Sequence, residues 1–350
     1  MKPKVIYITF ARSSFVEVDI AILTKRYNLI LNMYQWQKKW LLPLFLIHQL
    51  GFLLKNARST KIIIVSSGGY WSLIPVVFGK LFSIPVYIIL NGSDCASLPY
   101  VNYGNLRKSI LRNFCRLSFK HADMLLPVSE SLVLTQNTYF SSKNIDYQGY
   151  KHFFPHITTD YKVVYNGLDY NFWKKDNTIE KENNSFISVF SSSQYLLKGG
   201  DLILSVARRF PECKFYMAGL KQPPDVTSIS PNIYFLGYLN PLELKDYYNK
   251  CQFHFQLSIF EGFGCTLCEA MLCHCIPIGS DVNFIPEIIG DAGFILEHRD
   301  VDLLDELIRK ALRCDKKEAR GKIARKSVID NFSIENRELQ LISLIEQKTA

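Results

Sequence analysis

The stretch Phe260–Ser280, with the sequence FEGFGCTLCEAMLCHCIPIGS, places the strongest constraint on how this chain can fold. A tight glycine turn from Glu261 to Gly264 opens directly onto a helix expected over Thr266–Cys273. The following run Ile276–Gly279 is short and apolar, as in buried parallel strands. A helix that begins beneath a glycine loop presents free backbone N–H groups and a partial positive charge. The stretch therefore predicts a phosphate cradle beside a parallel sheet.

Two carboxylates flank this cradle. Glu261 precedes the turn, and Glu269 is the only charged residue of the expected helix. An ionised carboxylate on so apolar a helix is costly unless a partner neutralises it or donates hydrogen bonds to it. We interpret both carboxylates as ligand-facing. The alternative, which the residues alone leave open, is that the glycines merely allow a turn and that Glu269 reaches a surface.

Short Val/Ile/Phe/Tyr-rich strands alternate with amphipathic stretches along the whole chain, which predicts an α/β fold. A length of 350 residues fits two domains of ordinary size. A polar, charged stretch at Lys174–Asn184 interrupts the alternation, which then restarts. We expect a first domain over residues 1–168, a linker over 169–185 and a second domain over 186–332. We expect residues 333–350 to form a C-terminal helix, which could cross back to the first domain.

The longest apolar stretch is Trp40–Leu54, WLLPLFLIHQLGFLL. Its 15 residues include Pro43, His48 and Gln49, so it is shorter and more polar than a membrane-spanning helix. We predict a helix over Trp36–Lys55 that is kinked at Pro43 and buried; the alternative is an interfacial helix.

Charge is distributed unevenly. The net charge is +9, and residues 1–165 carry 19 Lys/Arg against 7 Asp/Glu, whereas residues 166–350 carry 22 against 25. A basic first half suits an anionic membrane surface or a phosphate-bearing partner, and the basic stretch Leu106–Lys120 could face such a lipid surface. We find no nucleic-acid-binding motif and expect no nucleic-acid partner. Nine cysteines and an N-terminus that begins as a strand indicate a reducing cytosol.

Four cysteines near the central stretch invite a zinc interpretation: Cys265, Cys268, Cys273 and Cys275, together with His274. All lie within one expected helix and strand, whereas a closed tetrahedral site usually takes a second ligand pair from a separate knuckle. Cysteine is also a good small core residue. We therefore expect packing and no metal.

With both halves considered, the chain resembles glycosyltransferase family 4, the retaining GT-B enzymes. In the second half the resemblance rests on Lys198-Gly-Gly-Asp201, on Gly237-Tyr-Leu-Asn240, and on Ser258–Gly264 followed by Glu269, with seven residues between the two glutamates. In the first half Ala122–Glu130 and Val163–Asp169 are similar to the same family. The resemblance implies two Rossmann-like, doubly wound domains that face each other across a cleft.

The resemblance also implies roles for individual residues. Glu261 would contact the hydroxyls of the donor sugar, Glu269 would hold the ribose, and Lys198 would neutralise the diphosphate as a catalytic residue. The remaining donor-binding positions are Gly262, Phe263, Gly264, Cys265 and Thr266 at the helix start, Gly237, Tyr238 and Leu239 beside the base, and Ser192 and Ser193. No metal or cofactor is implied, because the lysine and helix dipoles neutralise the phosphates.

Two positions depart from the family pattern. Family members usually carry an arginine where this chain has Ser192 or Ser193, so one diphosphate contact is missing or comes from elsewhere. The first domain often has histidine where this chain has Asn91. Asp94 could orient the acceptor there; the alternative is a turn or helix-capping residue. The acceptor-side loop is also atypical, with Ser13, Ser14 and Phe15 in place of paired glycines.

These observations predict a cytoplasmic glycosyltransferase, peripheral on the inner membrane face. It would move a sugar from a UDP- or GDP-sugar to a glycan or lipid-linked glycan in surface polysaccharide synthesis. Two alternatives stay open: a sugar-nucleotide epimerase with the same architecture, and a non-catalytic partner of a transferase.

Overall fold

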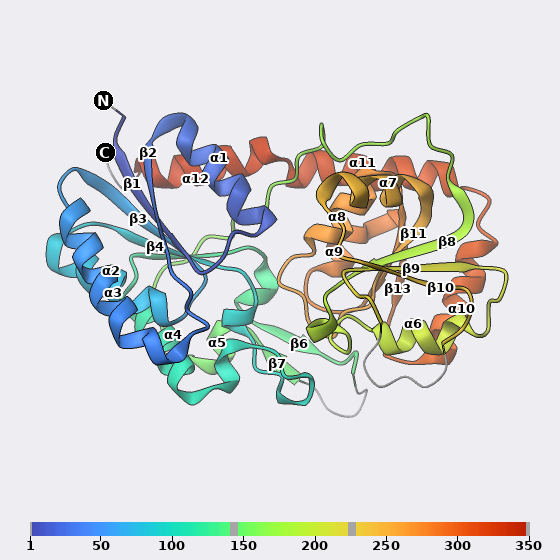
Figure 1. Cartoon of the computed structure of the whole chain (residues 1–350), viewed down its shortest axis with the longest axis horizontal. Coiled ribbons are helices and arrows are strands. Elements are labelled where there is room, and N and C mark those ends of the chain that lie inside the picture. Colours follow the sequence, from blue (N-terminus) through green and yellow to red (C-terminus); the bar gives the residue numbers. More distant parts are fainter. Residues whose placement is uncertain (1, 141–145, 223–228, 348–350) are drawn as a thin grey trace. The chain divides into compact units, whose positions relative to one another are not determined.

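The computed structural model describes residues 2–140, 146–222 and 229–347, and it confirms the α/β class. The described residues form two units, each built around its own sheet (Figure 1). The first unit draws on residues 1–135, 147–167 and 334–350, and the second on residues 136–146 and 168–333. The chain therefore leaves the first unit and returns to it twice, the second time with its C-terminal helix.

The first unit contains a five-stranded parallel sheet in the order β2-β1-β3-β4-β5. Its strands are rich in β-branched residues and are buried, apart from β2 at the edge. Their bounds are β1 Lys4–Thr9, β2 Asn28–Met33, β3 Thr60–Ser66, β4 Val86–Leu90 and β5 Met124–Pro127. The predicted closing strand Lys162–Tyr165 runs beside β5, with the Lys162 and Val164 N–H groups bonded to β5 carbonyls, but it forms no strand of its own.

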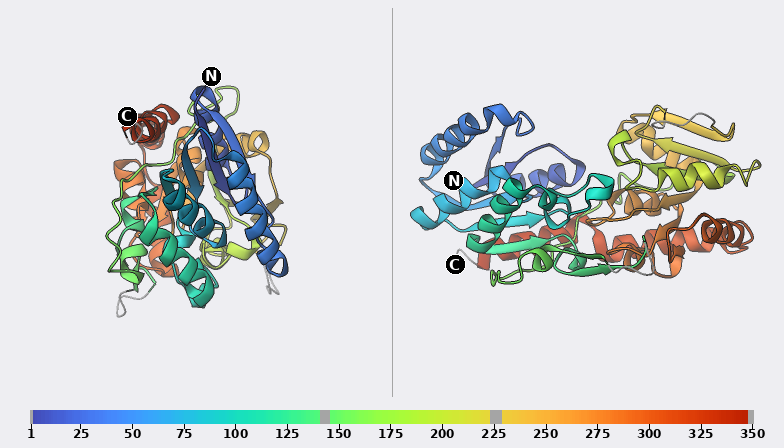
Figure 2. Two further views of the ribbon diagram at one scale, coloured as in Figure 1. Left: turned by 90° about the vertical axis from the view of Figure 1, so that its left-hand side faces the viewer. Right: turned by 90° about the horizontal axis from the view of Figure 1, so that it is seen from below.

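Helices cover both faces of this sheet. Helices α2, α3 and α4 pack side by side on one face, and α1 contacts the C-terminal helix α12 on the other (Figure 2). Tyr7 and Arg337 both bond the buried Asp19 of α1, which ties α12 to the sheet. The helices are α1 Ser14–Arg26, α2 Leu42–Asn56, α3 Tyr70–Phe82, α4 Ser109–His121, α5 Tyr150–Phe153 and α12 Ile334–Gln347.

The prediction of a buried, kinked helix at residues 36–55 is wrong. Helix α2 begins only at Leu42, so Pro43 lies in its first turn, where proline is compatible with a helix because that N–H has no helical partner. Only Gln49 and Leu53 are buried. The buried Gln49 amide donates to the Trp71 carbonyl at 3.0 Å. The sequence could not show this, because an apolar composition does not reveal which faces another element covers.

The second unit contains a six-stranded parallel sheet in the order β10-β9-β8-β11-β12-β13. Phe186 of β8 stacks between Phe215 of β9 and Phe253 of β11, at ring-centroid distances of 5.0 and 4.8 Å, and forms the centre of the core. The strands are β8 Glu182–Val189, β9 Lys214–Ala218, β10 Ile233–Gly237, β11 Cys251–Gln256, β12 Ile276–Ser280 and β13 Phe294–Leu296.

Helix α6 packs with α10, whereas α7 and α11 both pack with α8. The bounds are α6 Gly200–Ala207, α7 Pro241–Lys250, α8 Cys265–Leu272, α9 Ile285–Ile289, α10 Val301–Leu312 and α11 Lys317–Phe332. A separate two-stranded sheet pairs β6 Thr135–Asn137 with β7 Asp146–Gln148. The loop predicted over residues 138–160 thus holds β7 and α5, and its residues 141–145 lie outside the described part. Within the described residues, no helix has the length and apolar character needed to cross a membrane.

Candidate functional site

Sequence-predicted donor residues follow the carboxyl ends of β8 and β11, two neighbouring strands of the second sheet, and the adjacent strand β12 adds a residue that was not predicted. The loop after β8 carries Lys198, the loop after β11 carries Glu261, and the loop after β12 carries Asn283. Carboxyl ends of parallel strands share one edge of a sheet, which is where open α/β sheets bind ligands. Residues that are distant in the sequence therefore meet at this edge because each follows a parallel strand of the same sheet.

Glu261 is the centre of a polar cluster at this edge. Its Oε2 atom forms an ion pair with the Lys198 ammonium and accepts hydrogen bonds from Gln256 Nε2 at 2.6 Å and Ser258 Oγ at 3.2 Å. The Glu261 backbone N–H donates to Asn283 Oδ1 at 3.0 Å. The Lys198 and Glu261 side chains keep 14% and 15% exposure, so both charged groups border solvent. This geometry gives a fixed carboxylate and a fixed ammonium that a polar ligand can reach.

The turn between Glu261 and α8 has the predicted form. Gly264 precedes α8 with a φ of +114°, a conformation that side-chain-bearing residues rarely adopt. Helix α8 begins at Cys265, and the Thr266 hydroxyl donates to Gln256 Oε1 at 3.1 Å, which fastens the helix start to the end of β11. The Phe263 ring is buried against Phe284 and Phe332, so its side chain belongs to the core.

Glu269 lies one turn further along α8 and is buried. Burial raises the pKa of its carboxyl to about 8, and the nearby Tyr248 hydroxyl offsets part of that rise. A carboxyl with this pKa is mostly protonated at neutral pH, which resolves the cost of placing an acid on an apolar helix. Burial raises the pKa of the neighbouring Cys268 thiol well above its ordinary value, and Cys265, Glu269 and Glu261 act in the same direction.

The remaining donor positions lie around the same edge. Ser192 and Ser193 are exposed in the short 3-10 turn η6, Ser192–Gln194, which follows β8. Gly237 ends β10 with a φ of +66°, and Tyr238 after it is exposed. Leu239 is half-buried. Strand β10 is at the sheet edge, with β9 between it and β8, so these residues are further from Glu261 in the strand order.

Sequence reasoning missed several polar residues of this edge. Gln256 and Asn283 fix Glu261, and Arg299 reaches the first turn of α6, where its Nη2 bonds both Asp201 oxygens at 2.6 Å. Gln256 was detectable, because it is a polar residue at the carboxyl end of an apolar strand. Asn283 and Arg299 lie in loops, and no local pattern distinguishes them.

The acceptor-side residues lie in the first unit, at the carboxyl ends of β1 and β4. Ser13 precedes α1, with Ser14 and Phe15 in its first turn. The Asn91 amide donates to Ser67 Oγ at 2.9 Å and to Ser66 Oγ at 3.2 Å at the end of β3. Its Oδ1 atom is buried and has no hydrogen-bond partner among the described residues. Asn91 therefore holds an unsatisfied acceptor atom inside the loop after β4.

Asp94 is used by the fold. Its carboxylate is fully buried and accepts hydrogen bonds from the backbone N–H groups of Gly68 at 2.7 Å, Gly92 at 3.0 Å and Asn91 at 3.2 Å. Burial raises its pKa to about 6, and these N–H groups offset part of the effect. This geometry matches the turn-residue alternative rather than an acceptor contact, because both oxygens already face backbone donors.

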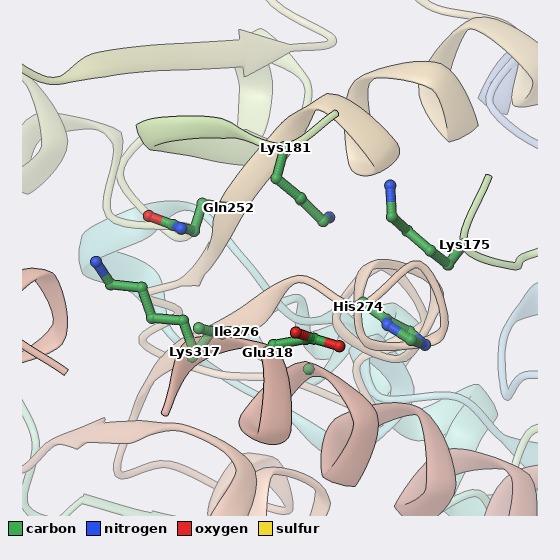
Figure 3. A pocket seen from close by; sticks show the side chains of 8 residues that line it. Lys175, Lys181, Gln252, His274, Ile276, Lys317 and Glu318 are labelled. Carbon is green, nitrogen blue, oxygen red and sulfur yellow. The ribbon is translucent and has the colours of Figure 1, made fainter. Parts of the chain in front are cut away.

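A cavity of about 300 Å³ lies at the opposite, amino-terminal end of the second sheet (Figure 3). Its lining includes Lys175, Lys181 and His274, and it begins at Gln252 of β11 and Ile276 of β12. The Lys181 ammonium donates to the carbonyls of Tyr248 and Cys251 at 2.7 Å and of Cys273 at 2.9 Å. These carbonyls belong to the ends of α7 and α8, so this cation neutralises helix carboxyl ends. We place no donor site there.

No disulfide joins the described cysteines near α8, and Cys268, Cys273 and Cys275 are buried. The Cys275 thiol contacts the Tyr248 carbonyl at 3.0 Å. Among the described residues, no group of three or more His, Cys, Asp or Glu side chains is arranged to hold a metal ion.

Comparison with known proteins relates the second half of the chain to a glycosyltransferase family. Residues 169–327 match the family model "Glycosyl transferases group 1". O-antigen chain mannosyltransferase B of Escherichia coli is 35% identical over 83 residues, which cover 24% of this chain and 22% of that protein. Serotype-specific mannosyltransferase WbdA of Escherichia coli is 35% identical over 78 residues, 22% of this chain and 10% of that protein. These alignments therefore span about a fifth of the relatives' length or less.

Solved structures match nearly the whole chain at low sequence identity. A sucrose-phosphate synthase from Thermosynechococcus elongatus has a TM-score of 0.74 at 12% identity, covering 99% of both chains. Anabaena HepE in complex with UDP-glucose has a TM-score of 0.74 at 15% identity, covering 98% of this chain and 99% of that one. The catalytic domain of Arabidopsis thaliana starch synthase IV, bound to ADP and acarbose, has 0.70 at 12% identity over 100% of both. The chain therefore has the fold of the GT-B glycosyltransferases, and its residues 169–327 match the group 1 glycosyl transferases.

Proposed function

We propose that this protein is a retaining, metal-independent hexosyltransferase. It moves a sugar from a UDP- or GDP-sugar to a glycan or lipid-linked glycan acceptor in surface polysaccharide synthesis. It works in the cytoplasm, peripherally on an anionic membrane surface. The observation that carries the proposal is the Lys198–Glu261 pair beside the Gly264 turn at the start of α8, within the segment that matches the group 1 family. The similarity to an O-antigen chain mannosyltransferase and to a serotype-specific mannosyltransferase supports the proposal of a polysaccharide acceptor.

In this proposal the ion pair is the ligand-free state of the site. A diphosphate bound at the N-terminal end of α8 takes over the Lys198 ammonium, because two phosphate charges attract the ammonium more strongly than one carboxylate does. Hydrogen bonds from Gln256 and Ser258 keep Glu261 in place. Its carboxylate then accepts hydrogen bonds from the sugar hydroxyls. The ion pair keeps both groups in position until the donor arrives.

Glu269 binds the ribose of the donor. Its carboxyl is buried and mostly protonated without ligand, so it can donate one hydrogen bond and accept another from a pair of ribose hydroxyls. The donor base lies at Gly237–Leu239, and the exposed Tyr238 ring is available to it. The residues of this edge bind and orient the donor, and the leaving phosphate accepts the proton of the acceptor hydroxyl. Catalysis then depends on positioning and charge stabilisation.

On the acceptor side we assign contact to Asn91, Ser13, Ser14 and Phe15. Asp94 supports Asn91 by fixing the backbone of the loop after β4. The proposal needs no cofactor and no metal, because Lys198 and the start of α8 neutralise the diphosphate.

A donor panel tests this function directly. Thermal melting of the full chain is measured with UDP-, GDP- and ADP-sugars and with the free nucleotides, and a true donor raises the melting temperature by mass action. Radiolabelled donor is then incubated with a lipid-linked glycan fraction, with and without EDTA. Transfer that survives EDTA supports the proposal.

Two results would contradict it. If no nucleotide sugar changes the melting temperature and no label reaches a glycan, the transferase assignment fails. If donor incubated alone is converted to a different nucleotide sugar, the chain is an epimerase instead.

A further inference from the structure

Helix α2 presents an apolar face to solvent. Leu44, Ile47, Leu50 and Leu54 follow helical spacing along it and are all exposed, with Ile47 at 68%. Trp40, just before the helix, is 79% exposed. Monomeric proteins rarely leave a contiguous apolar stripe of this kind uncovered, so it indicates an interaction surface.

The neighbouring helices extend this face. Helix α3 packs beside α2 (Figure 1) and exposes Val77, Leu81 and Phe82 near its C-terminal end. Helix α4 packs beside α3, with a hydrogen bond of 2.8 Å between Ser72 and Ser118, and exposes Ile110. We call the outer surface of α2, α3 and α4 the α2–α4 face.

This face is almost free of negative charge. Residues 20–122 contain 13 Lys/Arg and a single carboxylate, Asp94, which is fully buried. The acid nearest to the end of this run is Asp123, whose carboxylate pairs with Lys80 at 3.3 Å and bonds the Val86 N–H. The apolar stripe is therefore bordered by cations with almost no compensating acid.

Cations also gather at the N-terminal end of α2. The pKa of Lys108 is lowered by partial burial and then by the charges of Arg107 and Lys39, which shows that three cations from two segments lie close together. Lys38 adjoins them in sequence, and Lys55 and Arg58 follow at the other end of α2. Like charges repel, so a cluster of this kind is relieved by an anionic partner.

We propose that the α2–α4 face docks on an anionic lipid bilayer, with α2 lying in the membrane plane, Trp40 and Ile47 in the interface and the flanking lysines on lipid phosphates. Apolar side chains between basic residues match the layered chemistry of a bilayer surface. A second copy of this chain fits poorly, because it would bring the same carboxylate-free, cationic face against itself. The inference names the surface for the membrane association proposed above, and its test needs neither donor nor acceptor.

Tryptophan fluorescence gives a direct measurement. Of the four tryptophans, Trp36, Trp71 and Trp173 are buried, and Trp40 is exposed. Phosphatidylglycerol-containing vesicles added to the full chain should shift the emission of Trp40 to shorter wavelength, and brominated acyl chains should quench it. Trp40→Phe should abolish the shift while vesicle co-sedimentation persists. Vesicles of phosphatidylcholine alone should bind far more weakly, and added salt should weaken binding to the anionic vesicles.

Variants with a matched control locate the surface. Ile47→Glu/Leu54→Glu should lower vesicle affinity by about tenfold or more, because two apolar anchors are replaced by carboxylates facing lipid phosphates. Lys38→Glu/Lys39→Glu should lower it at low salt and much less at high salt. Leu339→Glu is the control, since Leu339 is 72% exposed on α12, on the opposite face of the sheet, and should bind as the unmodified chain does. Unchanged thermal melting shows that each variant is folded.

Three results would overturn the inference. The first is an unmodified chain that binds phosphatidylglycerol vesicles no better than neutral ones. The second is an Ile47→Glu/Leu54→Glu variant that binds as tightly as Leu339→Glu. The third is a dimer in light scattering that Ile47→Glu disrupts while vesicle binding is absent, in which case the occupant is a second copy. None of these results bears on sugar transfer, so the proposed enzymatic function is tested separately.

Discussion

Asp94 and Glu261 occupy corresponding places in the two sheets, each in the loop that follows a central parallel strand, yet the fold uses them differently. Asp94 is fully buried, and backbone N–H groups satisfy it. Glu261 borders solvent and is held by a lysine and two neutral side chains from its own strand and loop. The difference teaches that a carboxylate at a strand end is available to a ligand only when mobile or replaceable partners, not the backbone, neutralise it.

Replacing each carboxylate with its isosteric amide distinguishes the roles of Glu261 and Asp94. The largest effect on sugar transfer is expected at Glu261. Glu261→Gln should lower sugar transfer by about 10²- to 10³-fold, because a group that positions charge in the transition state is lost. Thermal stability should hardly change, since an amide oxygen can still accept from Gln256. The measurement is kcat/KM for transfer, with Glu212→Gln, an exposed acid after α6, as the control. Normal transfer by Glu261→Gln would remove this residue from the site.

Asp94→Asn should instead lower the stability of the protein and leave sugar transfer nearly unchanged. Its NH₂ group would face a backbone N–H donor in a buried place, which costs about 2–3 kcal/mol of unfolding free energy. Urea denaturation measures this loss, and transfer per folded molecule should stay within about twofold of the unmodified chain. A stable Asp94→Asn protein with severely reduced transfer would reverse the assignment and make Asp94 an acceptor-side group.

Glu269 extends the comparison to a buried carboxyl within the donor site. Its folded pKa of about 8 exceeds its ordinary value of 4.5, so the folded state holds a proton that the unfolded state has lost. This contribution to stability is complete below about pH 4.5 and disappears as pH rises towards 8, by up to about 1.4 kcal/mol per pH unit. Glu269→Gln, which cannot ionise, should lose less stability than the unmodified chain between pH 6 and 7.5, by about 2 kcal/mol. Parallel curves for the two proteins would show that Glu269 is already ionised when folded.

The smallest effect is expected at Lys198. Lys198→Gln should weaken binding of the free nucleoside diphosphate by about tenfold, and binding of the nucleoside by less than twofold, because only the former carries the charge that Lys198 neutralises. Isothermal titration calorimetry with both ligands measures this difference. Equal losses for the two would place Lys198 away from the phosphates and leave its pair with Glu261 as a structural contact.

The sequence predicted local features well where a single chemical requirement fixed them. The turn at Gly264 followed from a helix start beneath a glycine, and β12 at residues 276–280 followed from its apolar run. Alternation of strands and helices also predicted the two parallel sheets, since that pattern has few other compact solutions. Residue spacing along one strand and one helix was enough for these features.

Sequence alone determined the order of the elements, the strand ends at which polar residues meet, and the basic first half. The tertiary structure decided which groups neutralise one another: Lys198 with Glu261 across 63 residues, Asp94 with backbone N–H groups, and Glu269 with a proton. It also decided that α2 is exposed, against the sequence prediction. The physical reason is that periodicity marks the apolar face of an element, whereas burial and pKa depend on neighbours that the chain brings from far away.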